Sequence, residues 1–546
     1  MNLWVGHWRP PCRTRNIARR RSCGRPRAET MLAGGMARLR QYALTGRPGL
    51  EAGRSMTTHK PSEAQSNDDS GPGDLPANSA GARSARRKVY AATVAAALGG
   101  LLFGFDTSVI NGAVNSIQST FSLDPAILGF TIAITLLGCT VGAWFAGQLA
   151  DVWGRRPVMV LAACLFVISS IGSGFAFAVW DLMAWRIIGG LAIGIASVIA
   201  PAYIGEIAPA RLRGGLSSLQ QLAITLGIFL ALLSDAGMAR FAGGADSQLW
   251  WGLDAWRWML LVGVIPAVVY GILSLRIPES PQYLIRRGRK EEALAVIANV
   301  TGAADPEQRY KDIEESIESE RRSTYRDLRG HAFGLQPILW IGIGMAAFQQ
   351  LVGINAIFYY STTLWQSVGF SQQDSFTTSV FTATINVLLT LVAIFFVDRV
   401  GRKKLLLAGS VGMFIGLVAA AISFAQASGS GTNITLPAPW GPIALLGANL
   451  FVICFAATWG PVMWVVLGEV FPNKMRGIAL GVATAFNWIF NFLVTLLFPI
   501  MSHAVGLGFV YAGFAFFAAL SFWFVKALLP EVSGLELEDK SKLTRR

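Results

Sequence analysis

The stretch that decides the fold is DVWGRR at residues 151–156, because it returns as DRVGRK at residues 398–403. A second match follows in the same order: Glu206 stands seven residues before an Arg-Gly pair, and Glu469 stands seven residues before another. Each of these charged stretches directly follows a long apolar segment. Such a repeat of loop chemistry predicts a chain built from two related halves.

The apolar segments themselves place the chain in a membrane. Of its 546 residues, 53% are hydrophobic and 14% are charged, which is more apolar surface than one soluble core can bury. A spanning helix needs about 20 mostly apolar residues, and such segments recur along the chain. We predict an all-α membrane protein with twelve spans, near residues 91–114, 127–149, 157–178, 182–204, 217–237, 256–276, 337–361, 375–397, 404–425, 441–467, 477–499 and 508–529.

One long connection separates the sixth span from the seventh, and its two charged stretches at residues 286–300 and 306–322 are expected to form short surface helices. The composition before the first span, rich in Ser, Gly, Pro and Arg, is typical of a disordered extension. The predicted parts are a basic extension at 1–88, a six-helix half at 89–276, a cytoplasmic helical linker at 277–336, a second six-helix half at 337–530 and a cytoplasmic tail at 531–546.

The formal net charge of +14 resides mostly in the first 90 residues, where 17 basic residues outnumber six acids and leave about +3 for the rest. No basic patch interleaved with aromatics is present there, so nucleic-acid binding is not expected. Basic residues crowd the loops on one side of the predicted bundle, whereas the other side has essentially Arg240 alone. Because positive loops stay inside, both termini are expected in the cytoplasm and the protein in the cell membrane.

The four histidines and five cysteines are scattered along the chain and show no ligand spacing. We therefore expect no metal, no cofactor, no disulfide framework and no hydrolytic centre, and the chain is not predicted to be an enzyme.

The charged loops can also be given a mechanical role. Acids and bases at the cytoplasmic ends of neighbouring helices can form ion pairs that keep that face shut and break when it opens. Control of topology by positive charge alone is the alternative, but topology does not require acids. The predicted cytoplasmic gate consists of Asp151, Arg155, Arg156, Glu206, Arg213, Asp398, Arg402, Glu469 and Arg476.

Several further motifs carry a family resemblance. They are GGLLFGFD at 99–106, Arg186 with Gly189 and Gly190, PESP at 278–281, QQL at 349–351 with GIN at 353–355, and WGP at 459–461 with Trp464. With them, residues 88–530 resemble the sugar porter family of the major facilitator superfamily. The resemblance implies the major facilitator fold, with twelve transmembrane helices in two six-helix halves and a cytoplasmic helical insert. One departure is Gln282, where the family usually has an arginine; Arg286 or Arg287 could substitute.

A sugar that leaves water needs partners that both donate and accept hydrogen bonds, and side-chain amides do both. In an arbitrary membrane protein such amides more often join helices to one another. The resemblance implies that Gln221, Gln349, Gln350, Asn355, Asn386 and Asn487 contact the sugar, with Asn491 less clearly placed. It also assigns the Trp464 ring to the apolar side of the sugar, rather than to the membrane interface. Phe103 and Trp488 are secondary lining residues, and Tyr359 and Tyr360 are a candidate outer gate.

Asp106 stands inside the first apolar span, where an ionised carboxylate is expensive and its presence indicates a function. Near Arg186 it stays charged, and away from Arg186 burial favours the neutral form, so a proton is taken up. The pair is thus predicted to couple transport to protons; a purely structural ion pair would have the same sequence.

The predicted function is alternating-access transport of a monosaccharide, a glucose-like hexose, by symport with a proton into the cell. The partners are the sugar, the proton and the lipid bilayer. Proton-independent facilitated diffusion is the closest alternative. A transporter-like nutrient sensor is disfavoured by the short tail after Pro530, and a drug exporter by the amide set and the insert.

Overall fold

The computed structural model describes residues 80–208, 213–301, 305–319, 328–427, 436–471 and 475–529, and side chains at a few positions within these ranges are not described. The described residues contain twelve helical spans long and apolar enough to cross a bilayer, which confirms the predicted fold class. The predicted extension and tail lie almost wholly outside the described residues. The first helix, however, begins at Ala80, so residues 80–88 are helical.

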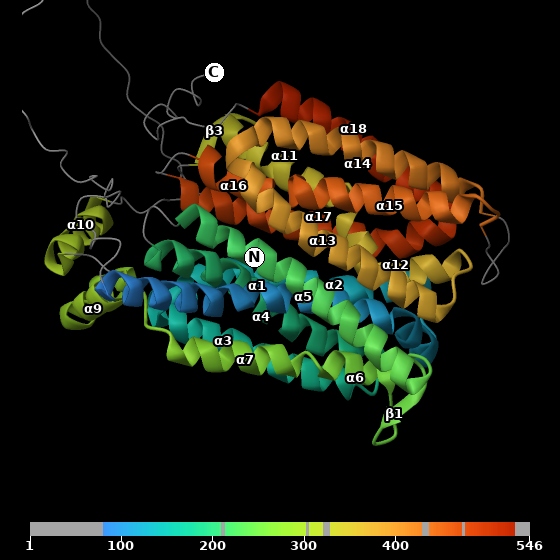
Figure 1. Cartoon of the computed structure of the whole chain (residues 1–546), viewed down its shortest axis with the longest axis horizontal. Coiled ribbons are helices and arrows are strands. Elements are labelled where there is room, and N and C mark those ends of the chain that lie inside the picture. The colour runs from blue at the N-terminus through green and yellow to red at the C-terminus, as the bar shows by residue number, and fades with distance from the viewer. Residues whose placement is uncertain are drawn as a thin grey trace, which may run out of the picture. The chain divides into compact units, whose positions relative to one another are not determined.

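Each half supplies six spans, and three of the twelve are interrupted (Figure 1). The first half contains α1 (Ala80–Phe121), α2 (Pro125–Trp153), α3 (Arg155–Gly174), α4 (Val179–Ile207), α5 (Arg213–Ala242) and the broken span α6 (Ala255–Leu261) with α7 (Val264–Arg276). The second half contains α11 (Pro337–Leu351) with α12 (Ile354–Ser367), α13 (Gln372–Val400), α14 (Arg402–Ala425), α15 (Trp440–Ala457) with α16 (Trp459–Val470), α17 (Arg476–Val505) and α18 (Leu507–Leu528).

The glycine of the repeated motif explains why the motif occurs between two spans. Gly154 joins α2 to α3 with φ 99° and ψ 167°, and Gly401 joins α13 to α14 with φ 93° and ψ 142°. This region of backbone space is open essentially only to glycine. Both copies of the motif therefore turn the chain sharply between two spans with the same local device.

The tenth span is interrupted at Thr458, whose φ of −136° and ψ of −82° end α15 and allow α16 to start at Trp459. Gly460 and Pro461, a glycine and a proline inside an apolar span, predict a break in its regular hydrogen bonding. The observed break comes slightly earlier. Pro461 then lies in the first turn of α16, where a backbone N–H has no intrahelical acceptor and its loss costs nothing.

Two connecting segments, an insert between the halves and a hairpin, complete the architecture. The insert between the halves contains α8 (Pro281–Arg286), α9 (Lys290–Val296), the π-helix η1 (Ile297–Thr301), α10 (Pro306–Ser319) and β3 (Arg329–Ala332). Its helices share a small core of Tyr283, Leu284, Ile285, Ala293, Ile297 and Tyr310. A hairpin of β1 (Gln248–Trp250) and β2 (Leu253–Asp254) joins α5 to α6, which the all-helical prediction did not include.

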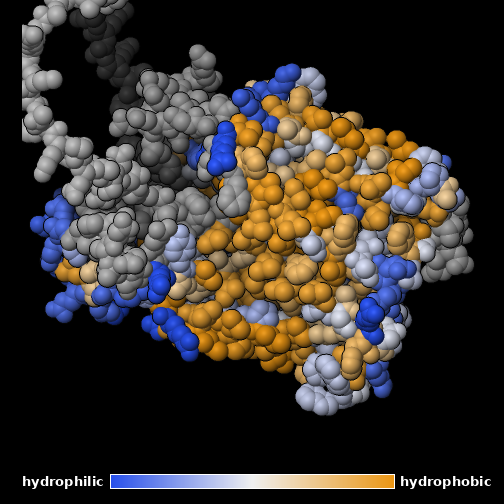
Figure 2. Space-filling model, in the orientation of Figure 1, coloured by the Kyte–Doolittle hydropathy of each residue, from blue (hydrophilic) through white to orange (hydrophobic). Residues whose placement is uncertain are grey.

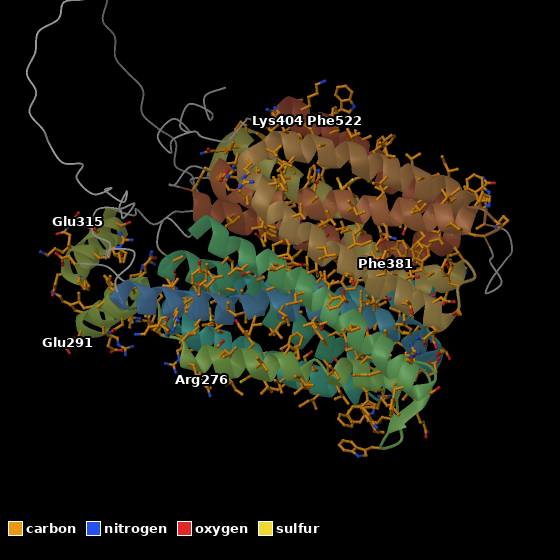
Figure 3. All side chains as sticks on the ribbon, in the orientation of Figure 1. Arg276, Glu291, Glu315, Phe381, Lys404 and Phe522 are labelled. Carbon is orange, nitrogen blue, oxygen red and sulfur yellow. The ribbon has the colours of Figure 1, made fainter. Side chains whose placement is uncertain are left out.

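The insert and both copies of the repeated motif lie at one end of the bundle, here called the motif face. The hairpin lies at the other end, the opposite face (Figure 1). Hydrophobic residues cover the side of the bundle between these ends, and hydrophilic residues gather at the ends (Figure 2). The exposed Phe381 of α13 lies on this apolar side, whereas Arg276, Glu291 and Glu315 lie toward the motif face (Figure 3). This distribution is that of a protein surrounded by lipid.

Small residues let the spans approach closely. A Cβ on Gly190 or Gly194 of α4 would run into the carbonyl oxygens of Thr135 and Cys139 in α2. Backbone contact of this kind is how helices associate in lipid, where apolar side chains gain little by leaving the tails.

Candidate functional site

Four of the predicted sugar-contacting amides form one hydrogen-bonded network between α11, α12 and α17. Asn487 Nδ2 donates to Gln349 Oε1 at 2.9 Å, and Gln350 Nε2 donates to Asn487 Oδ1 at 3.1 Å. Asn355 Nδ2 donates to Gln350 Oε1 at 2.6 Å. The break between α11 and α12, at Gly353 with φ 86°, brings Asn355 back toward Gln350. Each amide in the network can both donate and accept, as a polyol requires.

The network reaches the first half through its aromatic neighbour. Trp488 follows Asn487 on α17, and its ring meets Phe103 of α1 edge-on, with centroids 5.1 Å apart. Trp488 is 4% exposed, and its Nε1 has no hydrogen-bond partner among the described residues. A buried donor without an acceptor, one residue along α17 from Asn487, is a position where a sugar hydroxyl could bind.

Asp106 of α1 and Arg186 of α4 form a buried ion pair. Arg186 Nη1 lies 2.8 Å from Asp106 Oδ1, and the two side chains are 2% and 9% exposed. The Nε and Nη2 groups of Arg186 have no described partner. A cavity of about 10 Å³ adjoins the pair and is lined in part by Ser169, Ser170 and Ser173, which is close to the smallest space that holds one water molecule. A charged pair this dry depends on its partners remaining together.

On the motif face, the charges of the first half form a compact network. Arg155 Nη2 lies 3.0 Å from Glu206 Oε1, and Arg155 Nη1 lies 3.5 Å from Asp151 Oδ1. Glu279 accepts from the backbone N–H groups of Arg155 at 2.9 Å and Arg156 at 3.2 Å. The carboxylate therefore caps the N-terminus of α3, where unpaired N–H groups favour an anion.

The second half has the matching pair, Arg402 Nη2 to Glu469 Oε1 at 3.0 Å. Each of these pairs joins helices of one half, so in this conformation they brace the halves individually. The structure does not describe the side chains of Arg213, Asp398 and Arg476. The role of the whole set as a cytoplasmic gate remains a prediction.

Comparison with known proteins decides the family. A model described as "Sugar (and other) transporter" matches residues 92–543. The chain belongs to the sugar porter family. The "Glucose transport protein" of Synechocystis is 49% identical over 444 residues, covering 81% of this chain and 95% of that protein. The "Arabinose-proton symporter" of Bacillus subtilis is 37% identical, covering 82% and 93%.

Solved structures agree with this assignment. The proton:xylose symporter XylE bound to 6-bromo-6-deoxy-D-glucose has a TM-score of 0.70 and 34% identity, covering 84% of this chain and 99% of that one. The inward-open conformation of XylE from Escherichia coli has a TM-score of 0.71 and 33% identity, covering 83% and 99%. The fold of this sugar porter is thus the major facilitator fold, in a multi-pass membrane protein.

The remaining predicted site residues of the sugar porter are more dispersed. Gln221 of α5 and Trp464 of α16 are half-buried, and Asn386 of α13 is buried. Among the described residues, none of these three side chains is hydrogen-bonded to the amide network. Asn491 lies one turn from Asn487, and its Nδ2 is buried without a described partner. Tyr360 donates to Thr495 O at 2.9 Å and so ties α12 to α17.

Two arginines near the departure at Gln282 contact the end of α2. Arg286 lies 3.8 Å from Asp151, and Arg287 donates to the carbonyl oxygens of Asp151 and Val152. These contacts bind the insert to the end of α2; that they substitute for the arginine absent at Gln282 stays a prediction.

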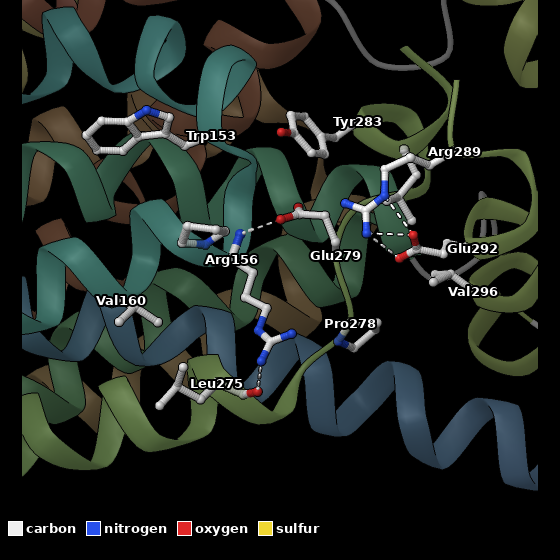
Figure 4. Close-up of a pocket in the computed structure, with 12 residues that line it drawn as sticks. Trp153, Arg156, Val160, Leu275, Pro278, Glu279, Tyr283, Arg289, Glu292 and Val296 are labelled. Carbon is white, nitrogen blue, oxygen red and sulfur yellow. Dashed lines mark hydrogen bonds and ion pairs between the residues drawn. The ribbon is translucent and has the colours of Figure 1, made fainter. Parts of the chain in front are cut away.

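A cavity of about 610 Å³ lies between α3, α7 and the insert, lined in part by Trp153, Arg156 and Glu279 (Figure 4). Its charges are already engaged: Arg156 donates to Leu275 O, and Arg289 pairs with Glu292. None of the residues of the amide network lines this cavity.

Sequence reasoning missed a second amide pair. Asn111 and Asn115, one turn apart on α1, form hydrogen bonds with residues of α12 in the second half. Their position inside an apolar span was the available signal, because a buried amide always needs partners.

Proposed function

We propose that this protein carries a glucose-like hexose across the membrane by alternating access, in symport with a proton and into the cell. The observation that supports this best is the network of Gln349, Gln350, Asn355 and Asn487, which presents neutral donors and acceptors from three helices. Sugar hydroxyls would replace amide-to-amide bonds one for one. Such an exchange gives modest affinity and permits release.

The similarity to a protein named for glucose transport, and to a structure holding a glucose derivative, favours a hexose. The similarity to two sugar-proton symporters favours proton coupling. We assign the coupling to Asp106, which is charged while Arg186 lies 2.8 Å away and takes up a proton when the pair separates.

α1 provides a physical link between sugar and proton. It carries Phe103, which touches Trp488, the residue after Asn487 on α17; Asp106, which pairs with α4; and Asn111, which bonds to α12. A shift of α1 caused by sugar therefore changes the environment of the carboxylate. Facilitated diffusion without protons is the second candidate, since a fixed ion pair would have the same geometry.

For orientation, we assign the motif face to the cytoplasm, since basic loop residues are retained there. Both termini are then cytoplasmic, and the ion pairs of Arg155 and Arg402 belong to the cytoplasmic gate.

The test is uptake of a panel of labelled sugars into proteoliposomes with an imposed pH gradient. Glucose should accumulate against its gradient, and an uncoupler should abolish accumulation. Asn487→Ala should lose uptake, whereas Asn299→Ala, an exposed amide in the insert, should not. Asp106→Asn should abolish uphill uptake but retain sugar exchange; uphill uptake in this variant would exclude the assigned proton site. Absence of sugar flux in the wild-type protein would refute transport itself.

A further inference from the structure

A second carboxylate lies inside the membrane and has no cationic partner. Asp235 of α5 is 0% exposed, two turns before the helix ends at the opposite face. Neither of its carboxylate oxygens makes a hydrogen bond of normal geometry with a described residue, and the polar group set against it is the backbone N–H of Gly112. A Cβ on Gly112 of α1 would come within 2.8 Å of Asp235 Oδ2. The side chain is therefore packed against bare helix backbone.

The surroundings of Asp235 are neutral. Gly104, Ser108, Gly112 and Ser116 follow one another at four-residue spacing along α1, and both glycines touch α5. The hydroxyls of Ser108 and Ser116 are buried without described partners.

Ionisable groups on the neighbouring elements are engaged or lie near the helix ends. Asp106 on α1 is held by Arg186. Arg257 on α6 donates to the carbonyl oxygens of Gly174 and Ala176. Asp374 on α13 bonds to Ser371 at the start of its own helix, and Arg240 stands in the last turn of α5.

These contacts decide the ionisation state. An unpaired carboxylate in a dry, apolar site costs several kcal/mol more than the neutral acid, so the group binds a proton instead. The burial of Asp235 without a cation therefore favours its neutral form. The groups of at least three His, Cys, Asp or Glu that a metal ion would use are absent from the described residues, so the geometry favours a proton over a metal ion.

Asp235 also lies where the two halves meet. Gly112 is next to Asn111, whose side chain bonds to Ser361 and Thr362 of α12. α5 itself packs on α13 of the second half. When the halves separate at the opposite face, α1 loses its contact with α12 and α5 loses its contact with α13. Water can then reach the carboxyl group.

We infer that Asp235 is a second proton-binding site of the transport cycle, separate from Asp106, which must be filled before the opposite face can close. The acid releases its proton to water on that side when the halves part, and it takes one back from the same side before they close. This site rests on the proposed function and adds a pH dependence to it. It does not change the number of protons carried per sugar.

The test is equilibrium exchange of labelled sugar in proteoliposomes, with equal pH on both sides, in an Asp106→Asn background that removes the first carboxylate. Exchange should fall about tenfold for each pH unit above the midpoint of Asp235. Adding Asp235→Asn, which is permanently neutral, should abolish this alkaline loss. Adding Asp246→Asn, the same change at an exposed carboxylate on the same face, should leave it intact.

Persistence of the alkaline loss in Asp106→Asn/Asp235→Asn would overturn the assignment, as would restoration of exchange by sodium ions at high pH. If Asp235→Asn does not fold, Asp235→Glu keeps the carboxyl group and should retain the loss with a shifted midpoint; an unshifted midpoint counts against the site. A wild-type protein that exchanges no sugar refutes the proposed function alone. The infrared C=O band of a protonated carboxyl group then decides: it should weaken in Asp235→Asn and not in Asp246→Asn, and an unchanged band refutes the site.

Discussion

Replacement of Asn111 by alanine tests how the two halves are held together at the opposite face. The Asn111 side chain donates to Phe358 O at 3.0 Å and Ser361 Oγ at 2.6 Å, and accepts from Thr362 N at 3.0 Å and Thr362 Oγ1 at 2.6 Å. All four bonds join α1 to α12. Thr362 Oγ1 has one proton, which is shared between Asn111 Oδ1 and the backbone oxygen of residue 111, 2.8 Å away. After the substitution this proton still has the backbone oxygen as its acceptor.

The magnitude follows from the number of bonds. At about 0.6 kcal/mol for each side-chain hydrogen bond in a membrane protein, the three bonds that have no replacement contribute about 1.8 kcal/mol. Their loss should shift the equilibrium between closed and open opposite faces about 20-fold toward the open form. Asn115→Ala is the matched comparison, because Asn115 makes two such bonds, to Gln366 and Thr363, each at 2.9 Å. It should shift the equilibrium only about eightfold.

The assay is the distance distribution between spin labels at the exposed positions Ser119 on α1 and Gln373 on α13. The short-distance population should decrease in the order wild type, Asn115→Ala, Asn111→Ala. If Asn111→Ala leaves the populations unchanged, or shifts them less than Asn115→Ala, these hydrogen bonds do not hold the halves together.

Three further predictions concern stability, measured as thermal unfolding in detergent. Glu279→Gln should cost about 1 kcal/mol, since a neutral amide caps α3 less well than a carboxylate; Glu292→Gln, in an exposed ion pair, should cost less, and equal costs would contradict the cap. Gly154→Ala and Gly401→Ala should each cost about 1–3 kcal/mol, because both glycines have backbone angles that other residues adopt only with strain. If the alanine variants are as stable as the wild type, the argument from backbone strain is wrong. Glu206→Gln should cost about 3 kcal/mol, because it removes the nearer and more buried of the two carboxylates that pair with the buried Arg155 and leaves only the exposed Asp151. Glu469→Gln should cost less, since its side chain is 31% exposed; the reverse order would refute the burial argument.

The sequence predicted the spans well because a helix in lipid must be apolar along its length. Each of the twelve predicted ranges overlaps one observed span. The hairpin at Gln248–Asp254 was not foreseen, and the tenth span is interrupted at Thr458 and not at Gly460 and Pro461, since both features depend on local backbone geometry that hydropathy does not encode.

The candidate site was accessible from the sequence only in part. Amides in apolar spans are visible as anomalies, and four of them lie together at α11, α12 and α17. Which neighbouring helix each amide faces depends on how the helices cross and on how each is rotated about its axis. The sequence pattern of a single helix contains neither the crossing angles nor the rotations. Asn111 and Asn487 are alike in sequence terms, yet one joins the halves and the other joins the predicted sugar site. Asp235 escaped notice for the same reason: its lack of a partner is a property of the packed structure.

The insert has a practical consequence for imaging. Glu279 and Arg287 bind it to the ends of α2 and α3, and its own core keeps α8, α9 and α10 together. It should therefore move with the first half as one body. An antibody fragment raised against α9 and α10 would project beyond the detergent belt from a fixed point. Such a fragment would provide a landmark for particle alignment in electron cryomicroscopy while leaving the second half free to move.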